Sequence, residues 1–193
     1  MPLDVVRNKH HRRYRGMSRF QFVLPFAVAL FLLSAAHAEM PFQPGGEPPE
    51  MLGRDQSGTN VTLDDFPDRV RVVTFWASWC GPCLTEIDVM EQLAGQVPDS
   101  DLRVIAVNVH ERNPVRVRRM LRRLDDPNLL YTEDRRDIIV DRYDIESIPL
   151  MMMIDHHGEI RYVHQGYGES KLDQIIEELN GLLVEQAKDR REG

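Results

Sequence analysis

The amino-acid sequence predicts an α/β fold in which a mixed central β-sheet carries helices on both faces. Apolar, β-branched runs alternate with segments of helical periodicity through the middle of the chain. The chain then ends with two short apolar runs and one long amphipathic segment, the pattern of a hairpin followed by a helix. Alternation favours parallel strands and a hairpin adds antiparallel ones, so the sheet is expected to be mixed.

Residues 1–38 are predicted to be a secretory signal peptide that takes no part in this fold. Six basic residues lie within 1–19, an apolar run follows over 22–36, and Ala-His-Ala at 36–38 is a small-x-small cleavage pattern. The apolar run is shorter than the roughly 18 residues expected of a membrane-spanning helix. A retained N-terminal anchor is the alternative, and Met17 is a second candidate start.

The net charge of the chain argues against a nucleic-acid partner. The formal charge is −7 at pH 7, and removal of residues 1–38, with six basic residues and one acidic residue, brings it to −12. Proteins that bind nucleic acids need basic surface to neutralise phosphates, and an acidic chain is poorly suited to this. Together with the signal peptide, the charge indicates a soluble exported protein, expected in the periplasm of a Gram-negative-type bacterium.

Beyond residue 38 the chain is predicted to consist of a linker, one domain and a tail. Residues 39–49 are rich in Pro and Gly, which indicates a linker that does not pack. Residues 50–184 are expected to form the α/β domain, here a single domain of ordinary size. Residues 185–193 are mostly charged and are expected to fray as a C-terminal tail.

The first half of the domain is predicted to run hairpin, strand, helix. The segment 51–66 contains a Ser-Gly turn and a short β-branched run, which indicates an N-terminal β-hairpin. Residues 69–76 are β-branched and aromatic, as in a buried strand. A helix is expected from Cys80 to Ala94, because apolar residues follow at helical spacing and Gly95 supplies a stop.

A central αβ insert is predicted next. Residues 102–109 form an apolar run typical of a buried strand. Residues 113–124 begin with Asn-Pro, a helix start, and continue with apolar residues at helical spacing. A short strand over 129–131 and a helix over 135–143 complete this part of the chain.

The domain is predicted to close with a hairpin and a helix. Residues 150–154 and 160–164 are apolar runs joined by a His-His-Gly turn, which indicates two antiparallel strands. Residues 170–184 place Leu and Ile at helical spacing, so one face of this last helix should pack on the sheet.

The motif Trp79-Cys80-Gly81-Pro82-Cys83 is where chemistry is expected, because it joins a buried strand to a helix. A thiol at a helix N-terminus lies beside free N–H groups and the positive end of the helix dipole. Both stabilise the thiolate, so the pKa of Cys80 should fall below that of a free thiol. Pro82 fits the first turn without loss of a hydrogen bond, and Gly81 lets a partner chain approach closely.

Two plainer interpretations of the Cys pair are an inert bridge and a zinc site. A bridge between residues three apart closes a very short loop and stabilises little. A zinc site needs four ligands, but the chain has no second Cys pair and its seven His are not arranged around this one. The pattern therefore indicates a redox-active pair, and neither a metal nor a cofactor is expected.

The segment from Phe75 to Cys83 resembles the thioredoxin superfamily, and in detail its exported branch, the TlpA/ResA/CcmG-type thiol–disulfide oxidoreductases. The similarity covers roughly residues 50–184 and includes Ser147-Ile148-Pro149 before the late hairpin. The resemblance implies a thioredoxin-like fold, with Cys80 as the attacking thiol and Cys83 as the resolving thiol. It also implies that Pro149 is a cis-proline facing the pair and that the backbone of Ile148 pairs with a substrate strand. Trp79, Gly81 and Pro82 would border the same substrate site.

Glu86 is a further candidate for catalysis. It lies three residues after Cys83 on the same predicted helix, and the exported branch often carries Glu at this position. Cytoplasmic thioredoxins instead bury an acid on the preceding strand, where this chain has Thr74. A partly buried carboxylate has a raised pKa and could exchange protons with Cys83. The plain alternative is a solvent-facing helix acid.

A run of three methionines and a stripe of arginines are two further features that could form binding sites. Met151-Met152-Met153 could supply soft ligands for Cu(I), but alternate strand residues point to opposite faces, which favours core packing. Six arginines at 112, 116, 118, 119, 122 and 123 form a basic stripe in an acidic chain. A solvated helix face is the plain interpretation, and a docking site for a partner or for anionic lipid is the alternative.

The expected function is thiol–disulfide exchange on exported proteins, in the direction of reduction, because Gly81 and Pro82 match the reducing thioredoxin dipeptide. The resemblance makes the haem-binding Cys pair of apocytochrome c a candidate substrate and implies a membrane-embedded thiol partner as electron donor. A monomer is expected. One alternative is a disulfide oxidase or isomerase that uses the same Cys pair. A Sco-like copper-handling protein is a second alternative, although Sco-like proteins have a wider Cys spacing than this chain. A third is a peroxidase of peroxiredoxin type, but neither Cys of this chain lies in the local motif of a peroxidatic Cys.

Overall fold

The computed structural model describes residues 43–46, 48, 50–122 and 127–193. The predicted signal peptide over 1–38 lies outside the described residues, as does most of the predicted linker. The strands are Met51–Arg54 (β1), Asn60–Thr62 (β2), Val70–Trp76 (β3), Leu102–Asn108 (β4), Leu130–Glu133 (β5), Leu150–Ile154 (β6) and Ile160–Gln165 (β7). The α-helices are Gly81–Ala94 (α1), Pro114–Leu121 (α2), Ile138–Tyr143 (α3) and Leu172–Glu192 (α4). Short 3₁₀ turns cover Leu63–Asp65 and Glu169–Lys171.

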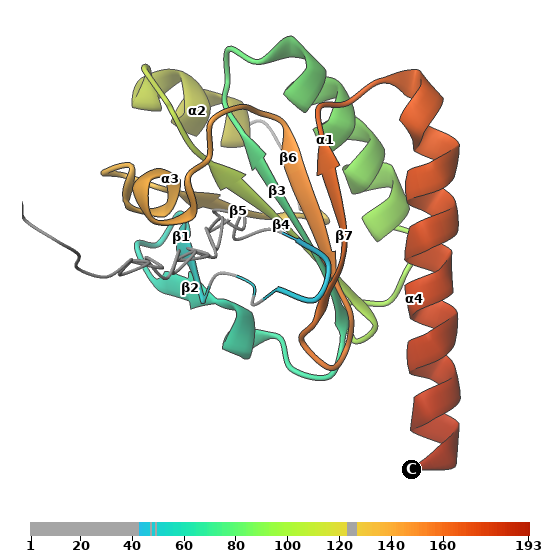
Figure 1. The fold of residues 1–193 in the computed structure, drawn as a ribbon. Coiled ribbons are helices and arrows are strands. Elements are labelled where there is room, and N and C mark those ends of the chain that lie inside the picture. The colour runs from blue at the N-terminus through green and yellow to red at the C-terminus, as the bar shows by residue number, and fades with distance from the viewer. Residues whose placement is uncertain (1–42, 47, 49, 123–126) are drawn as a thin grey trace, which may run out of the picture. The chain divides into compact units, whose positions relative to one another are not determined.

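The strands form one mixed sheet, as predicted, and the structure gives their order as β2-β1-β5-β4-β3-β6-β7 (Figure 1). β3 lies inside the sheet, parallel to β4 and antiparallel to β6. β1 and β2 form the predicted N-terminal hairpin, and β1 extends the sheet by pairing antiparallel to β5. Because β3 and β4 are parallel, their carboxyl ends lie at the same edge of the sheet, and the chain leaves both strands there toward a helix.

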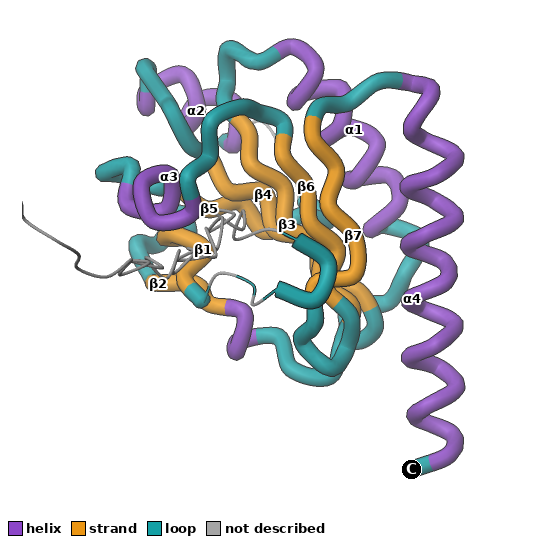
Figure 2. Tube along the Cα trace, in the orientation of Figure 1, coloured by secondary structure: helices purple, strands orange, loops and turns teal. Residues whose placement is uncertain are grey.

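The core has two layers because every residue of β3 is buried and alternate side chains point to opposite faces of the sheet. One layer contains Val72 and Trp76 together with apolar residues of α1, α2 and α4. The other contains Val73 and Phe75 together with α3 and the N-terminal hairpin. Figure 2 shows α1 and α4 along one side of the strands and α3 on the other. This confirms the prediction of helices on both faces.

The three consecutive methionines of β6 are core residues, as the strand periodicity predicted. All three are fully buried. Met151 and Met153 pack in the layer under α1 and α4, whereas Met152 packs in the layer under α3. Their thioethers therefore do not converge on one point.

The start of α3 differs from the prediction. α3 begins at Ile138 instead of residue 135, because the carboxylate of Asp134 accepts hydrogen bonds from the backbone N–H groups of Ile138, Ile139 and Val140. An acceptor on the preceding loop thus fixes the helix start. The helix predicted over 113–124 is seen as α2, and residues 123–126 lie outside the described part of the chain.

The prediction that residues 185–193 fray is wrong, because α4 continues to Glu192. Gln186 is buried on this extension, and its side-chain N–H donates to the carbonyl of Asp68 at 3.0 Å. Arg190 forms an ion pair with Asp101 and donates to the carbonyls of Asp68 and Ser100. Contacts with loops far away in sequence hold the segment helical. Within the described residues, no helix combines the length and the apolar character needed to cross a membrane.

Candidate active site

The Cys pair lies where β3 ends and α1 begins. Cys80 is the N-cap of α1, and Pro82 occupies the first turn, where a missing N–H costs no hydrogen bond. Cys80 and Cys83 form a disulfide with their Cα atoms 5.3 Å apart. The backbone N–H of Cys83 donates to Sγ of Cys80 across 3.3 Å. A charge on this sulfur would therefore meet both a hydrogen-bond donor and the positive end of the helix dipole.

The two sulfurs differ in access. Cys83 is fully buried, whereas Cys80 keeps 6% of its surface exposed. Trp79, Gly81 and Pro82 are all exposed around it. Only Cys80 can therefore meet a visiting disulfide first.

The loop before β6 supplies the opposite wall of the site. The Ile148–Pro149 peptide bond is cis, as the resemblance implied. The carbonyl oxygen of Ile148 lies 3.9 Å from Sγ of Cys80. The carbonyl of Pro149 accepts hydrogen bonds from the backbone N–H of Gly166 at 2.8 Å and from the side chain of Gln165 at 3.1 Å. The structure thus brings together the predicted residues of the motif and of this loop.

Glu86 is buried, with 1% of its surface exposed, and lies one turn beyond Cys83 on the same face of α1. The hydroxyl of Thr74 on β3 donates to its carboxylate. Burial raises the pKa of Glu86 to about 7, against the opposing effects of the Thr74 hydrogen bond and the positive charge of Lys171. The carboxyl group can therefore hold or release a proton near neutral pH.

Glu111, which the sequence pattern did not single out, braces the active-site turn. Its carboxylate accepts hydrogen bonds from the backbone N–H of Ser78 at 2.9 Å and of Asn113 at 2.7 Å. Burial acts to raise the pKa of Glu111, but these hydrogen bonds and one from Asn108 outweigh burial and lower it. Glu111 follows β4, which is parallel to β3, and so falls at the same sheet edge as the Cys pair.

Trp79 also contacts this second loop. Its ring is 49% exposed, and its indole N–H donates to the carbonyl of His110 at 3.1 Å. The guanidinium of Arg112 lies 5.7 Å from the centre of the ring, within the range of a cation–π contact. The loop from β4 to α2 is therefore part of the rim of the site.

The candidate metal ligands in the described residues lie elsewhere. Nε2 of His156 and Nε2 of His157 both lie near Oδ2 of Asp189, at 3.1 and 3.3 Å. Nδ1 of His156 is buried and has no hydrogen-bond partner among the described residues, whereas metal-binding His residues usually have one. This group joins the β6–β7 turn to α4 and includes none of the predicted site residues.

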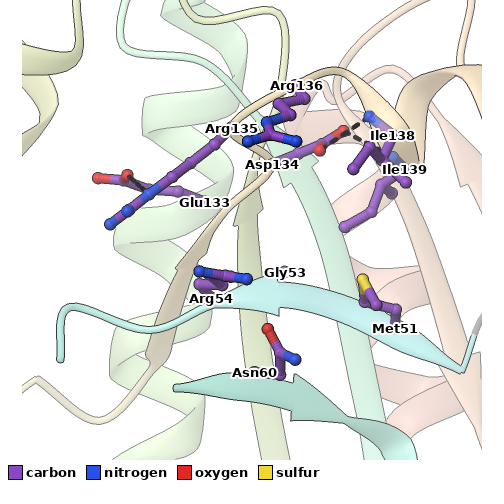
Figure 3. A pocket seen from close by; sticks show the side chains of 10 residues that line it. All are labelled: Met51, Gly53, Arg54, Asn60, Glu133, Asp134, Arg135, Arg136, Ile138 and Ile139. Carbon is purple, nitrogen blue, oxygen red and sulfur yellow. Dashed lines mark hydrogen bonds and ion pairs between the residues drawn. The ribbon is translucent and has the colours of Figure 1, made fainter. Parts of the chain in front are cut away.

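A pocket at the β1 edge is also separate from the Cys pair. It is lined by β1, β2, the end of β5 with the loop that follows it, and the start of α3 (Figure 3). Its charges are largely satisfied within the chain, since Arg135 pairs with Glu133 at 3.3 Å and Asp134 caps α3. Neither Cys80 nor Cys83 lines this pocket.

A redox-active Cys-Gly-Pro-Cys turn facing a cis-proline on a mixed sheet defines a thiol–disulfide oxidoreductase of thioredoxin-like fold. Residues 40–178 match the model of the Redoxin family, and the chain belongs to this family. It has thiol–disulfide oxidoreductase activity, in keeping with its relatives.

Two relatives and one solved structure illustrate the similarity. The thiol-disulfide oxidoreductase ResA of Halalkalibacterium halodurans is 30% identical over 135 residues, which are 69% of this chain and 73% of that protein. The thioredoxin-like protein YneN of Bacillus subtilis is 32% identical over 132 residues, 66% of this chain and 75% of that protein. A crystal structure from Chlorobium tepidum, provisionally assigned as the thiol:disulfide interchange protein DsbE, matches with a TM-score of 0.65 and 22% identity over 74% of this chain and 99% of that one. The last match supports the fold alone.

Proposed function

We propose that this protein is an exported reductase of protein disulfides, in which Cys80 attacks and Cys83 resolves. The observation that carries the proposal is the placement of Cys80. Its sulfur caps α1 and accepts the Cys83 N–H at 3.3 Å, and Cys80 keeps 6% of its surface open whereas Cys83 keeps none. This is the environment that stabilises a thiolate, and the thiolate is the form that attacks a disulfide.

The reaction proceeds in two exchanges. The Cys80 thiolate attacks one sulfur of the substrate disulfide, so that a mixed disulfide forms and the other substrate sulfur leaves as a thiolate. Cys83 then loses its proton and attacks Sγ of Cys80, which frees the second substrate sulfur. Two electrons and two protons pass in total from the protein's dithiol to the substrate, and the Cys80–Cys83 disulfide remains.

Glu86 is proposed as the group that takes the proton of Cys83 in the second exchange. Both residues are buried on one face of α1. Because little water reaches this face, a protein side chain is needed to accept the proton. A carboxyl group whose pKa is near 7 is well matched to that task. The backbone of Ile148, beside Cys80, is proposed to hold the substrate strand by β-pairing.

The cellular setting rests on the sequence and on resemblance. The N-terminal pattern of residues 1–38 supports export, with the periplasm as the proposed compartment. The oxidised pair must then be reduced again by a thiol partner in the membrane, because NADPH is confined to the cytoplasm. The Cys pair of an apocytochrome c is the proposed client.

The proposal is tested by trapping and by redox titration. Cys83→Ser should leave Cys80 joined to its substrates as stable mixed disulfides, whereas Cys80→Ser should trap none. Equilibration with glutathione should give a potential closer to the about −270 mV of thioredoxin than to the about −120 mV of DsbA. A value near that of DsbA would instead assign the protein as an oxidase.

A further inference from the structure

The exposed side of α2 and the residue before its cap carry a group of arginines, here called the basic face. We use this term for Arg112, Arg116, Arg119 and Arg122, all of which are exposed. Among the described residues, no carboxylate lies within ion-pairing distance of any of the four. Arg118 is different, because it donates to the carbonyl of Pro114 and borders a hollow with three carboxylates.

The basic face is unfavourable for the helix that carries it. Arg116, Arg119 and Arg122 follow one another at three-residue spacing, so like charges are neighbours on the helix surface. The rest of the chain is acidic, with a formal charge of −7 overall. Acidic side chains were thus plentiful, yet none of the described ones pairs with this face, which leaves its charge available to a partner.

The face adjoins the redox site. β3 and β4 are parallel, so α1 and α2 both begin at the sheet edge where these strands end (Figure 1). Arg112 lies over the ring of Trp79, the residue before Cys80. Glu111, its neighbour, holds the backbone of Ser78. The basic face is therefore continuous with the rim on which a substrate must lie.

We propose that the basic face binds an acidic polypeptide segment that flanks the target disulfide. This inference rests on the proposed function and specifies the class of substrate that the site prefers. Complementary charge beside a reactive centre speeds encounter and fixes orientation. Substrates with Asp or Glu next to the Cys pair should react faster than neutral ones of the same length.

The packing of α2 favours a polypeptide over a membrane as the occupant. Helices that lie in a bilayer surface insert an apolar face among the lipids. The apolar face of α2, with Val117 and Leu121, is buried in the protein core. To solvent α2 exposes mainly arginines, together with Pro114 and with Val115, which is 55% exposed, and Met120 is half-buried.

The test compares three synthetic peptides that share one Cys-Xaa-Xaa-Cys disulfide and differ only in flanking residues: Glu, Gln or Lys. The rate constant for their reduction by the reduced protein is measured by stopped flow at low and high salt. Hydroxyethyl disulfide, which is small and neutral, reports the intrinsic chemistry. We expect the Glu peptide to react about tenfold faster than the Gln peptide at low salt, and this advantage to vanish near 1 M salt.

A charge-reversed variant and a matched control localise the effect. Arg116→Glu with Arg119→Glu should abolish the advantage of the Glu peptide and leave the rate with hydroxyethyl disulfide unchanged. Lys188→Glu with Arg191→Glu makes the same change in net charge at the end of α4 and should retain the advantage. Thermal unfolding of both variants checks that each is folded.

Three outcomes would overturn the inference. Equal rates for all three peptides, with normal reduction of hydroxyethyl disulfide, would refute the acidic preference and leave the proposed function intact. Failure with hydroxyethyl disulfide as well would refute the reductase function itself. Equal peptide rates together with sedimentation on phosphatidylglycerol-containing vesicles, lost in the Arg116/Arg119 variant, would assign the face to lipid instead.

Discussion

Glu86 and Thr74 show how a single buried pair can set the pH response of the protein. Thr74 stands on β3, and its hydroxyl donates to the carboxylate of Glu86 on α1. Burial removes the water that would stabilise an ionised carboxylate. The hydrogen bond from Thr74 and the positive charge of Lys171 replace only part of this lost hydration energy. The folded state therefore favours the protonated acid.

The first residue-scale prediction concerns Glu86→Gln. The folded-state pKa of Glu86 is raised from 4.5 to about 7, so the group's contribution to stability is full below about pH 4.5 and is lost as pH rises through about 7. The substitution, which cannot ionise, should thus stabilise the oxidised protein near pH 8 by about 3 kcal/mol at most. Near pH 4 the two proteins should be alike. Urea unfolding at both pH values measures this, and equal stability near pH 8 would mean that Glu86 is not desolvated.

The reactive cysteines could be predicted from the sequence because their motif consists of residues that are close together in the chain. When two Cys three residues apart follow a buried strand, the first of them caps the helix. This placement does not depend on contacts with distant parts of the chain. Glu111 was missed because its contacts to Ser78 and Asn108 depend on strand pairing, which a linear pattern does not show. The burial of Glu86 was a hypothesis, and the structure bears it out.

At the scale of elements, the last helix depends on contacts from its charged end. The composition of 185–193 suggested a solvated tail, because charged residues rarely pack. In the structure Gln186 and Arg190 instead bond to the carbonyls of the loops that contain Asp68 and Ser100. Long-range partners of this kind override the local preference, and no pattern within the segment reveals them.

The element-scale prediction uses two neighbouring arginines. Arg190→Ala removes an ion pair to Asp101 and two hydrogen bonds to carbonyls, so it should lower the free energy of unfolding by about 1–2 kcal/mol. Arg191→Ala is the control, since Arg191 is exposed and its one hydrogen bond within the described part of the chain is to the carbonyl of Ala187, one turn earlier in the same helix. Urea unfolding should show little change in the control. Equal, small effects of both substitutions would indicate that the end of α4 adds no stability.

At the scale of the whole molecule, the direction of electron flow is linked to folding stability. A protein that gives up electrons readily is one whose folded state favours the disulfide over the dithiol. The proposed reductase should therefore unfold at a higher urea concentration when oxidised than when reduced. Each 30 mV of potential difference corresponds to about 1.4 kcal/mol for two electrons. Greater stability of the reduced form, as in DsbA, would reverse the assigned direction.

The fold class followed from the sequence because alternating strand and helix patterns leave few arrangements that bury both faces of a sheet. The buried run of β3 and the hairpin of β6 and β7 were predicted almost to the residue. The start of α3 was misplaced because a carboxylate outside the helix defines it. Boundaries thus depend on single capping contacts, whereas architecture depends on the distribution of apolar residues.

The small exposed area of Cys80 limits which proteins can be clients. Only 6% of the surface of Cys80 is open, although its neighbours Trp79, Gly81 and Pro82 are exposed. In-line attack needs the other sulfur to reach that small opening, which a disulfide held inside a folded protein cannot do. Bridges in chains that have not yet folded, or on protruding loops, remain accessible. The architecture of the turn would thereby spare the finished disulfides of neighbouring proteins in the same compartment.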